Sequence, residues 1–190
     1  GEYTMPRKNV RTRTVQFRVH DVTFRQADGL VIPNTAPLHI LAHAESVTLW
    51  LDNQKNGQRG ATIHHTACGN WFCPVQALAR RVASILTQGG APTTPLSFVS
   101  PGSHVTARNI TDLVHQAAID TNLVAQGYDL KRVSTHSLGA AGAMALKLQG
   151  VDDSLIMKSG QWTALTFLGA LHTGLTFRMT QHIHFVNVAG

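Results

Sequence analysis

Residues 47–65 have the sequence VTLWLDNQKNGQRGATIHH. Residues 47–51 and 62–65 are each predicted to form a strand, because both runs are rich in the β-branched and aromatic side chains that favour strands. Between them, Asn56-Gly57 is a strong turn signal, since both residue types accept the positive φ angles of a tight hairpin turn. The stretch therefore predicts a β-hairpin.

A further strand is predicted upstream of this hairpin. Val15, Phe17 and Val19 alternate with polar residues, and Val22 and Phe24 resume the alternation out of phase. Such a shift is typical of a bulged strand. The chain is therefore expected to begin with a small sheet.

The rest of the chain is predicted to be mainly helical, apart from a proline-rich loop over residues 91–102. Apolar spacing, caps and glycine stops mark the helices. The predicted helices span residues 73–86, 106–123, 136–148, 152–160 and 163–171. The second of these is expected to bury Ile110, Leu113, Val114 and Ala117 on one face.

Strands followed by a run of helices indicate an α+β domain rather than alternating βαβ units. The 190 residues and the 43% hydrophobic content suit one domain, which is assigned to residues 1–190. Because Gly1-Glu2-Tyr3 has no initiator methionine, we expect the sequence to be a fragment that is truncated at its front.

The charge balance favours a polyanionic partner. Lys and Arg number 16 against 10 Asp and Glu, which gives a formal net charge of +6. A basic run near the front would either form a solvated strand face or lie along DNA phosphates. This run comprises Arg7, Lys8, Arg11, Arg13, Arg18 and Arg25. The chain has neither a run of about 20 apolar residues nor a signal-peptide pattern, so we expect an intracellular protein without a membrane span.

A small metal-binding protein is an alternative from another functional class. His64, His65, Cys68 and Cys73 lie close together in the sequence, and His and Cys are zinc ligands. Their spacing differs from the usual paired ligands of zinc sites, which are separated by two to five residues. The competing interpretation is a buried Cys73 thiol at the start of a helix, with Pro74 in its first turn.

Three sequence blocks in the second half carry a resemblance to a known family. They are THSLGAAGA at 135–143, GVDDSLI at 150–156 and GQW at 160–162. In order and spacing they resemble the catalytic domain of the tyrosine recombinases, the phage integrase family. That family has Thr-His-x-Leu-Arg before a small-residue helix, then a Gly-His or Gly-Trp box, then a tyrosine.

The resemblance extends over nearly the whole chain. Residues 53–57, 73–78 and 185–188 are similar to recombinases of certain retrotransposons. It implies DNA recombination and integration in a transposable element, with double-stranded DNA as partner and no cofactor. It also implies assembly on DNA, either as a homo-oligomer or with an intact recombinase, and a nuclear location if the source is eukaryotic.

The resemblance also implies roles for individual residues. In the family, a tyrosine attacks a DNA phosphodiester, two arginines bind the phosphoryl oxygens, a lysine protonates the leaving oxygen and histidines assist proton transfer. Lys55 matches that lysine, although without the resemblance it would be an ordinary turn residue. His136 matches the histidine of the His-x-x-Arg motif. These two positions retain the family's residue types.

Other family positions have changed. Gly139 stands where the second arginine belongs, Gln161 stands at the second His/Trp position beside Trp162, and Ala170 stands where the tyrosine belongs. Glu2 matches a glutamate that follows the family's first arginine, so that arginine would lie ahead of Gly1.

No other residue offers a replacement nucleophile. Tyr3 and Tyr128 are the only tyrosines, and both precede the His136 helix. An identical protomer therefore has no tyrosine to donate. This copy is expected to be a pseudoenzyme, and Gly139 is expected to pack against the next helix as Gly142 does.

DNA contacts are the activity that the resemblance still implies. The residues expected to make them are Arg7, Lys8, Arg11, Arg13, Lys55 and Arg132. The sequence thus leaves three hypotheses: an inactive recombination domain, a residual DNA-binding module, and the small His/Cys metal-binding protein.

Overall fold

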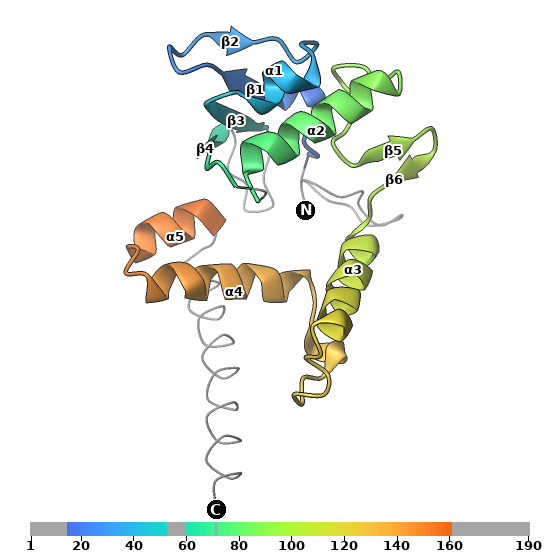
Figure 1. Ribbon diagram of the computed structural model, residues 1–190, viewed down its shortest axis with the longest axis vertical. Helices are drawn as coiled ribbons and strands as arrows, with labels where there is room; N and C mark the ends of the chain where they lie inside the picture. Colours follow the sequence, from blue (N-terminus) through green and yellow to red (C-terminus); the bar gives the residue numbers. More distant parts are fainter. Residues whose placement is uncertain (1–14, 53–59, 71, 161–190) are drawn as a thin grey trace, which may run out of the picture. The chain divides into compact units, whose positions relative to one another are not determined.

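The structure, a computed structural model, describes residues 15–52, 60–70 and 72–160, with the side chains of 158–160 excepted. It is a mixed α+β structure, as predicted (Figure 1). The chain divides into two compact units, Gly1–Asn109 and Ile110–Gly190. The assignment of residues 1–190 to one recombinase-type domain stays a prediction.

Four strands of the first unit form an antiparallel sheet in the order β2-β1-β3-β4 (Figure 1). The strands are β1 Val22–Arg25, β2 Val31–Ile32, β3 Ser46–Leu51 and β4 Ala61–Thr66. β3 and β4 pair along their whole length, with Ser46 opposite Thr66, so the predicted hairpin is confirmed. Residues 53–59, which connect the two strands and include Lys55, fall outside the described residues.

The bulged strand predicted to run to Phe24 is confirmed only in its last part, where β1 begins at Val22. Val19–Asp21 form a 3-10 turn, η1, between an extended segment and β1. Phe17 and Val19 before β1, and Val22 and Phe24 within it, are all buried. The turn takes up the extra residues and returns the side chains to the buried side, which is why the alternation in the sequence changes phase.

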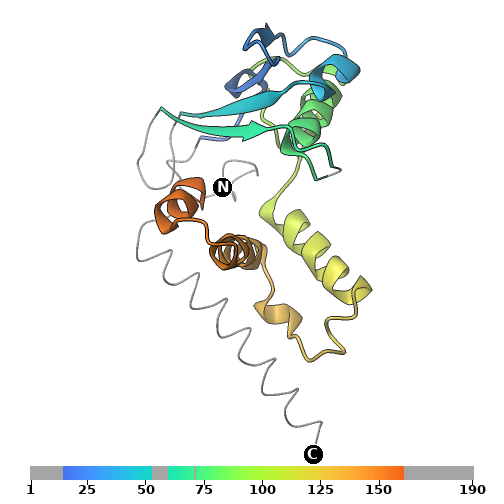
Figure 2. The same cartoon turned by 60° about the vertical axis from the view of Figure 1, so that its left-hand side comes forward.

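Helix α2, Pro74–Thr87, closes the apolar face of the sheet, as can be followed in Figure 2. Its buried residues are Val75, Ala79, Val82 and Ile85, which recur at helical spacing. They share one core with Phe24, Val47 and Leu49 of the strands and with Leu41 of the short helix α1, Leu38–Ala42. Full burial of each large apolar side chain stabilises the fold by about 1.5–3 kcal/mol.

A hairpin over residues 98–104 begins inside the segment 91–102, which was predicted to be a loop. Its strands are β5, Phe98–Ser100, and β6, Ser103–His104. Arg81 of α2 holds the start of β5, because its Nε donates to the carbonyl oxygen of Leu96 at 2.6 Å and its terminal NH₂ donates to that of Phe98. Burial lowers the pKa of Arg81, whose charge is therefore partly desolvated. Proline signals alone could not reveal this long-range anchor.

The described part of the second unit is helical. It contains α3, Ala107–Asp120, which begins at the end of the first unit, the 3-10 turn η2, Leu130–Arg132, α4, Thr135–Leu148, and α5, Asp153–Gly160. These three α-helices match three predicted ones. Gly150, at φ +76°, ends α4, and the Asp152 carboxylate accepts from the backbone N–H of Ser154 to start α5. The predicted helix over 163–171 lies outside the described residues.

Little of the described second unit is buried. Ala143 and Ile156 form its small core, with Val151 and Met157 partly buried beside them. The prediction of a buried face on α3 is wrong. Ala118 is the buried residue of that helix, and Leu113 is 66% exposed. Apolar spacing predicts a face correctly, but whether that face is covered depends on which elements pack against it.

Replacing Arg81 by Met should lower the free energy of unfolding by about 1–3 kcal/mol, because two carbonyl groups lose their donor. Urea denaturation would measure the loss. The matched control is Arg80→Met, at an exposed position of the same helix, where we expect a change within about 0.5 kcal/mol. Equal losses in the two variants would contradict an anchoring role for Arg81.

Candidate functional site

Three of the predicted site residues lie in the described part of the chain: Arg132, His136 and Gly139. The others lie outside the described residues. They are Arg7, Lys8, Arg11, Arg13, Lys55, Gln161, Trp162 and Ala170. The structure therefore brings together one local part of the predicted site, at the start of α4.

The first turn of α4 is fixed by a reciprocal cap. The Ser134 hydroxyl accepts from the backbone N–H of His136 at 3.2 Å, and the Ser137 hydroxyl accepts from the backbone N–H of Ser134 at 3.0 Å. Such a capping box satisfies backbone donors that the helix itself leaves unpaired. His136 is thereby held in the first turn with its side chain exposed.

His136 and Gly139 lie on the same side of α4. Residues three apart in an α-helix are separated by about 60° around its axis, so their side chains are neighbours. Gly139 is partly exposed. A long side chain at position 139 would reach the surface beside His136, which is the arrangement that a His-x-x-Arg motif produces.

A basic turn immediately precedes this helix. In η2 the Asp129 carboxylate accepts from the backbone N–H of Lys131 at 2.9 Å, and Lys131 and Arg132 are both exposed. The Ser137 hydroxyl donates to the carbonyl oxygen of Arg132 at 3.3 Å, which joins the turn to α4. The two cations are thus attached to the same short segment as His136.

A further hydrogen bond fixes this segment against α3. His115 Nε2 lies 2.7 Å from the carbonyl oxygen of Val133, so it donates in the tautomer with a proton on Nε2. The turn, the cap and α3 are therefore connected by side-chain to backbone hydrogen bonds rather than by a large core.

The expectation that Gly142 packs against the next helix is wrong. A Cβ atom added to Gly142 would meet nothing within 4 Å apart from its own helix and chain neighbours. The contact between α4 and α5 runs instead through Ala143 and Ile156. Gly142 is therefore not required for close packing.

The structure gives the metal hypothesis no support. Adjacent residues of a strand point to opposite faces, so His64 and His65 of β4 diverge. His64 Nδ1 lies 3.1 Å from the Thr48 hydroxyl, and burial lowers the pKa of His65, with a smaller effect from His64. Among residues 15–52, 60–70 and 72–160, no three His, Cys, Asp or Glu side chains group as metal ligands would. The competing prediction for Cys73 is confirmed, since it is buried directly ahead of Pro74.

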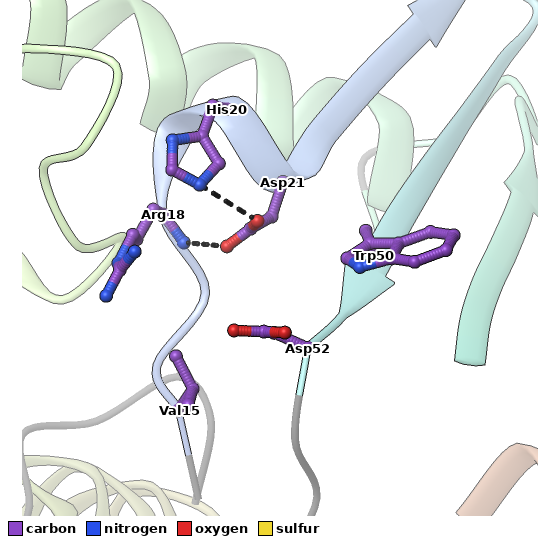
Figure 3. Close-up of a pocket in the computed structure, with 6 residues that line it drawn as sticks. All are labelled: Val15, Arg18, His20, Asp21, Trp50 and Asp52. Atoms are coloured by element: carbon purple, nitrogen blue, oxygen red, sulfur yellow. Dashed lines mark hydrogen bonds and ion pairs between the residues drawn. The ribbon is translucent and has the colours of Figure 1, made fainter. Parts of the chain in front are cut away.

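A cavity of about 370 Å³ in the first unit was not predicted (Figure 3). It is lined by Val15, Arg18, His20, Asp21, Trp50 and Asp52. The Asp21 carboxylate accepts from the backbone N–H of Arg18 at 2.8 Å and lies 3.2 Å from His20 Nε2. The lining contains two carboxylates and one guanidinium, so it does not favour an anion. The sequence did not predict this cavity, because residues 19–21 were expected to form a strand and form the 3-10 turn η1 instead.

The arginines of the described front segment do not form one basic row. Arg18 lines the cavity, whereas an Arg25 Nη donates to the carbonyl oxygen of Gly29 at 2.9 Å. Arg25 therefore closes the β1–β2 turn. The remaining members of the predicted basic run lie outside the described residues.

Comparison of the chain with protein-family models, with curated proteins and with solved structures finds no match. Among the described helices, none combines the length and the apolar character that a membrane crossing needs.

Replacing Ser134 by Ala should destabilise the first turn of α4 by about 1 kcal/mol, because the His136 N–H loses its acceptor. Hydrogen exchange at the α4 amides would measure this as faster exchange. Ser134→Asn, which keeps a capping oxygen, is the control and should exchange like the parent chain. Unchanged exchange in Ser134→Ala would show that the cap does not hold this turn.

Proposed function

We propose that the chain is a tyrosine-recombinase-type domain of a mobile element that binds double-stranded DNA and does not cut it. The observation that carries this proposal is the first turn of α4, where an exposed His136 and Gly139 lie side by side behind a basic turn. In the family that the sequence resembles, the corresponding histidine and arginine act on one DNA phosphate. The chain keeps the first of these side chains and lacks the second.

Retained DNA binding is supported by charge. The net charge is +6, and Lys131 and Arg132 are exposed beside the start of α4. Cations near DNA release condensed counterions when they neutralise phosphates, which gives affinity without sequence preference. The positive end of the α4 helix dipole, which lies at this helix start, also favours anions. Binding of this kind requires no nucleophile.

Loss of strand cleavage is supported by the residue types at two positions. Ala170 offers no nucleophile, and Gly139 offers no donor for the charge that develops on the phosphoryl oxygens. Loss of one such donor typically costs about 10²- to 10³-fold in rate, and loss of the nucleophile removes the covalent step itself. No tyrosine follows Tyr128, so a second copy of the chain cannot supply one.

This function implies a partner wherever recombination occurs. An intact recombinase bound to the same DNA would supply the chemistry, and in a eukaryotic cell the two would meet in the nucleus. The alternative, a residual DNA-binding module, would keep the DNA contacts and either serve such an intact partner or have no partner. Duplex binding is common to both, so it is the property to test first.

Gly139→Arg should strengthen duplex binding and steepen its dependence on salt. The new guanidinium lies on the side of α4 that carries His136, and one added phosphate contact raises the salt slope of log K by about 1. Fluorescence anisotropy with a labelled duplex over a series of salt concentrations would measure both quantities.

The matched control is Ala141→Arg, at an exposed position of the same helix. Position 141 lies about 140° around the axis from His136 and about 160° from Gly139, so this variant adds the same charge to the opposite side. Its salt slope should stay close to that of the parent chain. Equal gains in both variants would mean that only net charge matters, and absence of binding at low salt would refute the DNA-binding function.

The unaltered chain should form no covalent adduct with a nicked suicide duplex. In such a substrate the short cleaved strand diffuses away, so religation cannot release a protein that has become covalently attached. A denaturing gel would show such an adduct as a shifted band. Ala170→Tyr alone should not restore it, because the attacked phosphate still lacks the donor at Gly139. Rescue requires Ala170→Tyr with Gly139→Arg, in a chain that carries the family's first arginine ahead of Glu2. A band from the unaltered chain would contradict the proposed loss of chemistry.

A further inference from the structure

The only two cysteines of the chain lie next to each other in space, between the end of β4 and the start of α2. The backbone N–H of Cys68 donates to the sulfur of Cys73 at 3.5 Å. The Cys68 side chain also lies within hydrogen-bonding reach of that sulfur. Both thiols are free. Any disulfide within the chain would therefore join this pair.

The loop between them is folded back on itself. Gly69, at φ +66°, takes the left-handed conformation that reverses the chain. The backbone N–H of Cys73 then donates to the carbonyl oxygen of Asn70 at 3.0 Å, and the N–H of Phe72 donates to the Asn70 side-chain oxygen at 3.0 Å. These bonds hold the two cysteines near each other before any covalent link forms.

The two sulfurs have different surroundings. Cys68 is exposed and Cys73 is buried. The pKa of the Cys73 thiol is lowered to about 7, first by the backbone N–H of Cys68 and then by that of Gln76 at the start of α2. Near neutral pH a large fraction of Cys73 is therefore thiolate, the form that attacks disulfides. A reagent from solution meets Cys68 first.

We propose that Cys68 and Cys73 form a redox-active pair that closes to a disulfide by exchange with a small-molecule disulfide such as glutathione disulfide. The inference rests on the hydrogen bond from the Cys68 backbone N–H to the Cys73 sulfur and on the unequal exposure of the two thiols. It is independent of DNA binding.

The exchange takes two steps. First, the Cys68 thiolate attacks one sulfur of glutathione disulfide, so that a Cys68–glutathione bond forms and one glutathione thiolate leaves. Second, the Cys73 thiolate attacks the Cys68 sulfur, so that the Cys68–Cys73 bond forms and the second glutathione thiolate leaves. The two protein thiols lose two electrons and two protons, and glutathione disulfide is reduced to two glutathione molecules.

The Cys68–Cys73 disulfide would link the end of β4 covalently to the start of α2, the helix that covers the sheet. This link closes a short loop, so its effect on global stability is expected to be smaller than that of a disulfide across a long loop. Its local effect falls on the junction between these two elements.

The test uses the full chain, reduced and then exposed to glutathione disulfide, with mass spectrometry of the intact protein and of its unreduced peptides. The expected product has lost two hydrogens and contains peptides joined through Cys68 and Cys73, with a glutathione adduct only as an early species. A persistent glutathione adduct, a disulfide-linked dimer or two unreacted thiols would overturn the proposal.

Two variants separate the steps. Cys73→Ala should accumulate a lasting glutathione adduct on Cys68, because the second step is blocked. Cys68→Ala should show no adduct in the time in which the parent chain is fully oxidised, because Cys73 is covered. Rapid modification of Cys73 in that variant would contradict the assigned order. Mapping of the unaltered chain needs no variant and decides the proposal even where Cys73→Ala, at a core position, disturbs folding.

Discussion

Burial of the sheet face beneath α2 is the interaction on which the rest of the first unit depends. Phe24, Val47 and Leu49 are fully buried in the core cluster that the strands share with α2. A hairpin alone is at best marginally stable in water, so β3 and β4 need this cover to keep their register. Arg81 of the same helix also fixes the start of β5, because it donates to the carbonyl oxygens of Leu96 and Phe98.

In its described part, the second unit depends less on a hydrophobic core than the first unit does. Its helices bury little, so local hydrogen bonds determine the geometry of the candidate site. Ser134 and Ser137 set the first turn of α4, Asp129 sets the basic turn, and His115 ties that turn to α3. Short polar contacts of this kind fix the direction of nearby side chains without a large core. They also leave the surface of α4 open to charged partners.

Much of the fold was predictable where the signal is local. The hairpin of β3 and β4, the start of α2 at Pro74 and the caps of α4 and α5 follow from residue types a few positions apart. The 3-10 turn at Val19–Asp21 and the hairpin at β5 were missed, because both depend on distant partners. Asn34, for example, donates to the carbonyl oxygens of Val19 and Val22. For the candidate site, the resemblance singled out His136 and Gly139, and their spacing of three residues places them on one side of α4. The hydrogen bond from His115 that anchors the basic turn had no sequence signal.

A glycine at position 139 makes little demand on the described fold. Glycine inside a helix costs about 0.5–1 kcal/mol relative to alanine, and at position 139 the cap and the Ala143–Ile156 contact remain to offset it. An arginine aimed at DNA contributes to catalysis rather than to folding, so its absence leaves α4 intact. Under the proposed function the same reasoning applies to charge, because Lys131 and Arg132 would attract phosphates whether or not a nucleophile follows. Binding and cutting would then depend on different side chains, so a chain could keep the first while lacking the second.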